Sequence, residues 1–127
     1  MTNSTQLLKT SRRLNQLSSE ILQYLNIYPL STNRNELNAL AREYTSLSNE
    51  IAGQSLEDLV GSIKVHANHI KTSAENLQNA INSISNRDQA LSRLGTLIGL
   101  STDILSALNT GNFASLGSAI GNLDSEF

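Results

Sequence analysis

The chain has 127 residues, no cysteine, and a formal net charge of −2 from 9 basic and 11 acidic side chains. This length suffices for one domain with a hydrophobic core, and the absence of cysteine excludes disulfides and thiolate chemistry. The small net charge, with Arg12 and Arg13 as the only adjacent basic pair, argues against nucleic-acid binding, which normally uses a basic surface.

The first predicted helix covers residues 4–28. An apolar residue recurs every seven positions from Leu7 to Tyr28, which is the pattern of a helix with one buried stripe. The helix is expected to end at Pro29, the only proline, because proline disfavours a helical conformation at the residue before it.

The second predicted helix, residues 34–52, has a narrow apolar seam with a row of carboxylates along its edge. The row repeats every seven residues, about 10 Å along a helix. Two of these carboxylates are therefore too far apart to share a metal or to form an acid–base pair on one helix. We interpret the row as the solvated margin of the helix, with pairing to Lys or Arg of a neighbouring helix as the alternative. Its members are Glu36, Glu43, Glu50 and Glu57.

The third predicted helix, residues 56–84, follows a slip in the apolar pattern. Five residues separate Ile51 from Leu56, where three or four would keep the helical register. Gly53 lies in this interval and disfavours helix. We predict a short break over residues 53–55, with a single bent helix as the alternative.

The fourth and fifth predicted helices, residues 87–109 and 113–123, lie on either side of Gly111. Glycine commonly ends a helix in a left-handed conformation, so Gly111 is the expected stop. Ser85 or Asn86 is the expected N-cap of the fourth helix, because short polar side chains accept hydrogen bonds from the free N–H groups of the first turn.

The segment from Leu94 to Leu123 contains one charged residue, Asp103. Its apolar face is wider than one groove between helices can cover, so we expect a second copy of the chain or a partner protein to cover part of it. Two G-x-x-x-G sequences, starting at Gly95 and Gly117, are typical of closely packed helices, and we favour packing over membrane contact. The predicted interface residues are Leu94, Leu97, Ile98, Leu100, Ile104, Leu105, Leu108, Phe113, Leu116 and Ile120.

Patterns for catalysis, nucleotide binding and cofactor binding are missing, so we predict a protein that is not an enzyme and has no cofactor. His66 and His69 have the spacing of two metal ligands on one helix face. A third ligand is not evident, and the E-x-x-H sequence of di-iron bundles is absent. Histidines that border an apolar seam are the more common explanation of such a pair.

The sequence therefore predicts an all-α antiparallel bundle of four main helices with a short C-terminal helix, forming a single domain over residues 1–127. We expect a non-enzymatic interaction or assembly module that self-associates through its C-terminal third, with a homo-oligomer or a protein as partner. A membrane-active or pore-forming small protein and a metal-binding bundle are the alternatives. Without a signal peptide or transmembrane run, a cytoplasmic location is expected, and export by a signal-less route stays open.

Overall fold

A computed structural model of the chain describes residues 2–55 and 58–127, except for the side chains of residues 2–4 and Phe113. All regular secondary structure in these residues is helical, so the predicted all-α antiparallel bundle with a short C-terminal helix is confirmed. The elements are α1 (Thr2–Ile27), α2 (Arg34–Ile51), α3 (Gly61–Asn82), α4 (Gln89–Thr110) and α5 (Phe113–Asp124).

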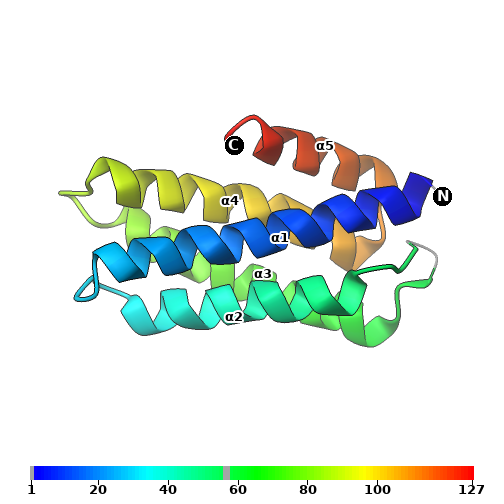
Figure 1. Cartoon of the computed structure of the whole chain (residues 1–127), viewed down its shortest axis with the longest axis horizontal. Coiled ribbons are helices and arrows are strands. Elements are labelled where there is room, and N and C mark those ends of the chain that lie inside the picture. The colour runs from blue at the N-terminus through cyan, green and yellow to red at the C-terminus, as the bar shows by residue number, and fades with distance from the viewer. Residues whose placement is uncertain (1, 56–57) are drawn as a thin grey trace.

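The four long helices run alternately up and down, and α5 lies on the outside of the bundle against α4 and α1 (Figure 1). α1 packs closely on α2, and α3 packs closely on α4, whereas the contact between α2 and α3 is sparser. The bundle consists of two tight helical hairpins that meet along looser seams, one between α2 and α3 and one between α1 and α4.

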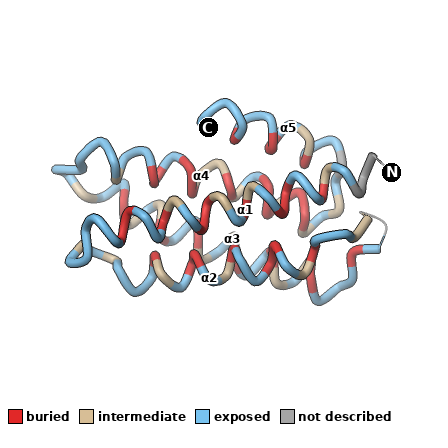
Figure 2. Tube along the Cα trace, viewed as in Figure 1, coloured by how far each residue is buried: buried red, intermediate tan, exposed pale blue. Residues whose placement is uncertain are grey.

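Each long helix turns its apolar stripe toward the interior of the bundle (Figure 2). Tyr44 is the largest fully buried side chain, and its hydroxyl lies 2.5 Å from the Ser101 hydroxyl. Ser101 itself donates to the Ile98 carbonyl at 2.6 Å. Because a serine hydroxyl has one proton, Tyr44 is the donor to Ser101. Burial raises the pKa of Tyr44 far above its ordinary value.

The main correction to the predicted helix bounds concerns α3, which begins at Gly61 and ends at Asn82. The predicted break is present, because α2 ends at Ile51 and Gly53 has a left-handed φ of 80°. The break is longer than predicted, and residues 58–60 lie outside any α-helix, while Leu56 falls outside the described residues. Leu59 is nevertheless buried. An apolar side chain can thus enter the core from a non-helical connection, so apolar spacing overestimated the helix.

The ends of α4 are set by one aspartate and one glycine. Asp88, not Ser85 or Asn86, is the N-cap, and its carboxylate accepts a hydrogen bond of 2.7 Å from the Leu91 N–H. A carboxylate is favoured there because it satisfies a free N–H and opposes the positive end of the helix dipole. Gly111 ends α4 as predicted, with a φ of 69° that glycine adopts without strain.

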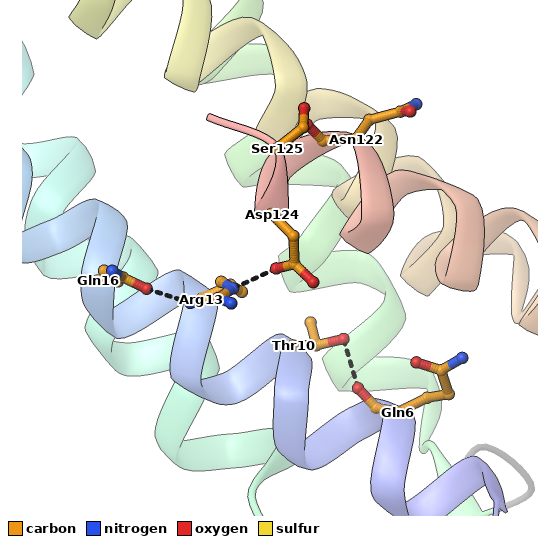
Figure 3. A network of polar contacts seen from close by, with 7 residues as sticks. All are labelled: Gln6, Thr10, Arg13, Gln16, Asn122, Asp124 and Ser125. Carbon is orange, nitrogen blue, oxygen red and sulfur yellow. Dashed lines mark hydrogen bonds and ion pairs between the residues drawn. The ribbon is translucent and has the colours of Figure 1, made fainter. Parts of the chain in front are cut away.

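α5 is held against the bundle by an apolar face, and by an ion pair and two cation–π contacts near the C-terminus. Leu116, Ile120 and Leu123 form the buried face, none of them more than 3% exposed. At the end of α5, Asp124 pairs with Arg13 of α1 (Figure 3). The Phe127 ring lies 5.5 Å from the Arg13 guanidinium carbon and 5.8 Å from that of Arg93. α5 is thereby docked on α1 and α4 together.

Candidate functional site

The residues predicted as an interface lie mostly inside the chain's own core. All of them except Leu100 and Phe113 are at most 3% exposed. Leu100 is partly buried against the core, and the Phe113 side chain lies outside the described residues. The apolar face of residues 94–120 therefore does not need the outside cover that was expected, because α4 packs against α1, α3 and α5 of the same chain.

The first glycine pair serves the contact between α3 and α4. A Cβ atom on Gly95 would lie 3.2 Å from Cγ2 of Ile81, and one on Gly99 would overlap the side-chain amide of Gln78. In the second pair, Gly121 has no neighbour within 4 Å of such an atom. Among the described residues, no helix has both the length and the apolar character needed to cross a bilayer.

The two histidines of α3 do not converge on a common ligand. Both ring nitrogens of His66 contact carboxylates of α2, whereas His69 is exposed to solvent. Across residues 2–55 and 58–127, no group of three or more His, Cys, Asp or Glu side chains is placed to hold a metal ion. The H-x-x-H spacing therefore does not build a metal site in this part of the chain.

His66 instead bridges two members of the acidic row. Its Nδ1 lies 2.7 Å from Oε1 of Glu50, and its Nε2 lies 3.0 Å from Oε2 of Glu43. The two glutamates are two helical turns apart on α2, and their side chains converge on the two nitrogens of one imidazole ring. The interpretation of the row as a solvated margin is thus corrected at Glu43 and Glu50, which pair with a neighbouring helix as in the alternative, but with a histidine in place of Lys or Arg. Glu57 lies outside the described residues.

The two contacts of His66 define its protonation state. A neutral imidazole has one N–H, so it can donate to only one carboxylate and would turn a lone pair toward the other. The imidazolium form donates to both. This geometry therefore favours the positively charged form of His66, and the two contacts link α2 to α3.

Burial and charge act in opposite directions on His66. Partial burial lowers the pKa of His66. The hydrogen bonds to Glu43 and Glu50 and the negative charges of these residues raise the pKa by more than burial lowers it, so the pKa lies above its ordinary value. The imidazolium is consequently favoured in the folded chain relative to the unfolded chain. This coupling makes the stability of the bundle depend on pH.

We predict that the free energy of unfolding falls as pH rises through the raised pKa of His66. The stabilisation is fully present below about pH 6.5, the pKa of an unfolded histidine. His66→Gln should lower stability by about 1 kcal/mol at pH 6, since charge-assisted hydrogen bonds that remain partly exposed contribute on that order. It should also flatten the pH dependence above pH 6.5. Urea denaturation from pH 6 to 9 measures both effects. His69→Gln, the control at an exposed histidine, should retain the wild-type slope, and an unchanged slope in His66→Gln would contradict the prediction.

Beside this bridge, the looser seam between α2 and α3 opens into a groove of about 300 Å³. Its floor contains Leu40 and Leu77, which are 2% and 4% exposed. The groove follows α2 from Glu36 to Glu43 and α3 from Ser73 to Ala80, in each case about 10 Å along the helix. Its complete lining is Asn33, Glu36, Ala39, Leu40, Glu43, Ser73, Asn76, Leu77 and Ala80.

The groove has one acidic edge and no fixed positive charge. Glu36 and Glu43 line the α2 side, Ser73 and Asn76 line the α3 side, and none of the described lining residues is Lys or Arg. Glu43 also takes part in the His66 bridge, so the acidic edge and the bridge are continuous. We refer to this lining as the α2–α3 groove.

Four other concave regions in the described part of the chain lack this combination of an apolar floor and charges of one sign. The region between α4 and α5 is larger, about 450 Å³, but is lined by small and polar side chains such as Ser106 and Ser118. The region near Tyr24 and Tyr28 contains both Glu20 and Arg93, which form an ion pair. The α2–α3 groove is therefore the best-defined candidate site.

Comparisons with protein-family models, with curated proteins and with solved structures found no match for this chain. The candidate site consequently depends on geometry alone. Sequence reasoning had singled out the acidic row and His66 separately but did not connect them. Contact between the acidic row and His66 depends on how α2 and α3 are rotated and shifted relative to each other. The spacing of apolar residues on either helix does not define this arrangement.

Proposed function

We propose that this chain is a non-enzymatic protein–protein interaction module that holds an α-helical segment of a partner protein in the α2–α3 groove. The single observation that carries the proposal is this open, apolar-floored groove between two otherwise tight helical hairpins. An amphipathic helix that lays its apolar face into a groove between helices is a recurring mode of peptide recognition.

The dimensions of the groove support a helical occupant. The lining follows α2 and α3 for about two turns, the distance over which side chains at i, i+4 and i+7 of a helix lie on one face. The buried floor residues Leu40 and Leu77 provide apolar contacts for such side chains. A volume of about 300 Å³ is at the lower end for small-molecule pockets, which also favours a few anchoring side chains over an enclosed ligand.

Selection of a randomised helical peptide library on the immobilised full chain tests this proposal. We expect enriched peptides to share apolar anchors at i, i+4 and i+7, and to shift backbone NMR signals at residues 33–43 and 73–80. Ala39→Trp, which fills the exposed edge of the groove, should abolish binding, while Ala114→Trp on α5 should not. Peptides that map elsewhere, or a selection without enrichment, would refute the proposal.

A second candidate function is self-association through the C-terminal third, by exchange of α5 between two copies. It is favoured by the attachment of α5, which follows α4 after only Gly111 and Asn112 and packs only at the outside of the bundle. Such an element can dock on another copy in the same way as on its own chain. Light scattering on the full chain between about 10 μM and 1 mM should show a mass that rises toward that of a dimer; a constant monomer mass would exclude exchange.

A further inference from the structure

We propose that the helix bound in the α2–α3 groove is basic, and that a Lys or Arg of this helix replaces His66 at Glu43, so that binding releases a proton. This inference rests on the function proposed above and specifies the chemistry of the partner. Within the chain, the acidic row already contacts one basic side chain, that of His66.

The His66 bridge shows that two carboxylates of the acidic row contact one imidazole of the neighbouring helix, in a geometry that suits a cation. The imidazolium donates to Glu43 at 3.0 Å and to Glu50 at 2.7 Å. Glu36, one heptad before Glu43, lies on the same edge of the groove, is exposed, and has no ion-pair partner among the described residues. The row is therefore incompletely neutralised on the side where the groove is open.

Glu43 is the residue that the bridge and the groove share. Its side chain is 33% exposed and lines the groove, while Glu50 does not. An ammonium or guanidinium group on a helix in the groove can therefore approach Glu43 from solvent. Glu50, with the shorter contact to His66, is left to hold the imidazole by its other nitrogen.

The exchange at Glu43 changes the charge state of His66. Once a Lys or Arg neutralises Glu43, the imidazolium keeps one hydrogen bond and loses half of its compensating negative charge. The pKa of His66 is then lower in the complex than in the free chain, so the proton on Nε2 leaves to solvent in the pH range between the two values. His66 continues to donate from Nδ1 to Glu50. Binding should consequently strengthen as pH rises, because the free chain holds a proton that the complex does not.

Among the described charged groups near His66, only carboxylates of α2 contact its ring. On α3 itself, the Lys64 side chain extends toward Gly111 at the end of α4, and His69 is exposed. Asp58, in the connection before α3, accepts a hydrogen bond from Ser55. No described titratable group of α1, α4 or α5 contacts the imidazole ring. Glu43 and Glu50 are therefore the groups that govern its protonation.

Three helical peptides with identical leucine anchors at i, i+4 and i+7, flanked by Lys, by Gln or by Glu, test the inference on the full chain. Isothermal titration calorimetry at pH 6 and pH 8, in two buffers of different ionisation enthalpy, measures affinity and proton release together. We expect the Lys peptide to bind about 3- to 10-fold more tightly than the Gln peptide, as one or two partly exposed ion pairs provide. The Glu peptide should bind most weakly.

The affinity of the Lys peptide should rise between pH 6 and pH 8, with net proton release from the wild-type chain. His66→Gln should remove the proton release, and His69→Gln should retain it. Should the Gln peptide bind in the groove as well as the Lys peptide, the basic partner is wrong while the interaction function stands. Preference for Lys without proton release would overturn the exchange at Glu43, and binding by none of the three would count against both proposals. The buffer comparison on wild-type protein keeps the test decisive if His66→Gln folds poorly.

Discussion

Tyr44→Ala should lower the free energy of unfolding by about 4 kcal/mol, a large part of the 5–15 kcal/mol typical of a domain. Tyr44 is fully buried, so removal of its ring leaves a cavity that the helices on either side cannot close without moving. The substitution also removes the hydrogen bond from α2 to Ser101 of α4. Guanidinium denaturation followed by circular dichroism measures the loss.

Two further tyrosine variants separate the contributions of ring and hydroxyl. Tyr44→Phe keeps the ring, and Ser101 keeps its bond to the Ile98 carbonyl, so the expected loss is about 1 kcal/mol. Tyr28→Ala removes a ring that is 38% exposed and should cost much less than Tyr44→Ala. Equal losses in Tyr28→Ala and Tyr44→Ala would show that Tyr44 is not a central packing residue.

The double substitution Leu116→Ala and Ile120→Ala should undock α5 and lower stability by about 3–5 kcal/mol. Each truncation of a buried leucine or isoleucine costs about 2–5 kcal/mol, but two on one helix cannot cost more than the docking of that helix. The Arg13–Asp124 pair is partly exposed, and such pairs contribute little, so it cannot hold α5 alone. Denaturation measures the stability, and amide hydrogen exchange locates the opening.

The exchange measurement distinguishes undocking from general weakening. Fast exchange should be confined to residues 113–124 and to the surface of α4 beneath them. The control removes the same side-chain atoms at exposed positions, Leu22→Ala with Leu30→Ala, which are 47% and 98% exposed. This control should stay within about 1 kcal/mol of wild type. Faster exchange spread evenly over α1 to α4 would mean that α5 is an integral part of the core.

The molecule consists of two helical hairpins, α1–α2 and α3–α4, and the added helix α5, and these parts contribute differently to stability and binding. The pairs α1–α2 and α3–α4 have the densest contacts, so they supply a stable frame. α5 covers part of α4 and α1, and the α2–α3 groove lies between the other two helices of the bundle. The proposed partner helix would occupy this side of the bundle, and it would do so without exposing the core.

The helical class of this protein and its main boundaries follow from the sequence. An apolar residue at every seventh position predicts a buried helical stripe wherever it occurs, because side chains at that spacing share one face. Pro29 and Gly111 mark ends through backbone stereochemistry, which needs no tertiary contact. The shortage of charged residues after Leu94 also indicates burial, because apolar side chains that stayed in contact with solvent would remain hydrated at a cost in free energy.

The sequence could not say what buries the C-terminal third or what the acidic row contacts. Both depend on the rotation and spacing of neighbouring helices, which result from the packing of the whole core and not from any one stripe. Thus α5 of the same chain covers the face for which an outside cover was expected. His66, 23 residues after Glu43, contacts two carboxylates whose spacing on one helix had seemed too wide for a shared ligand. The α2–α3 groove has the same origin, because it exists only where two tightly packed hairpins meet loosely.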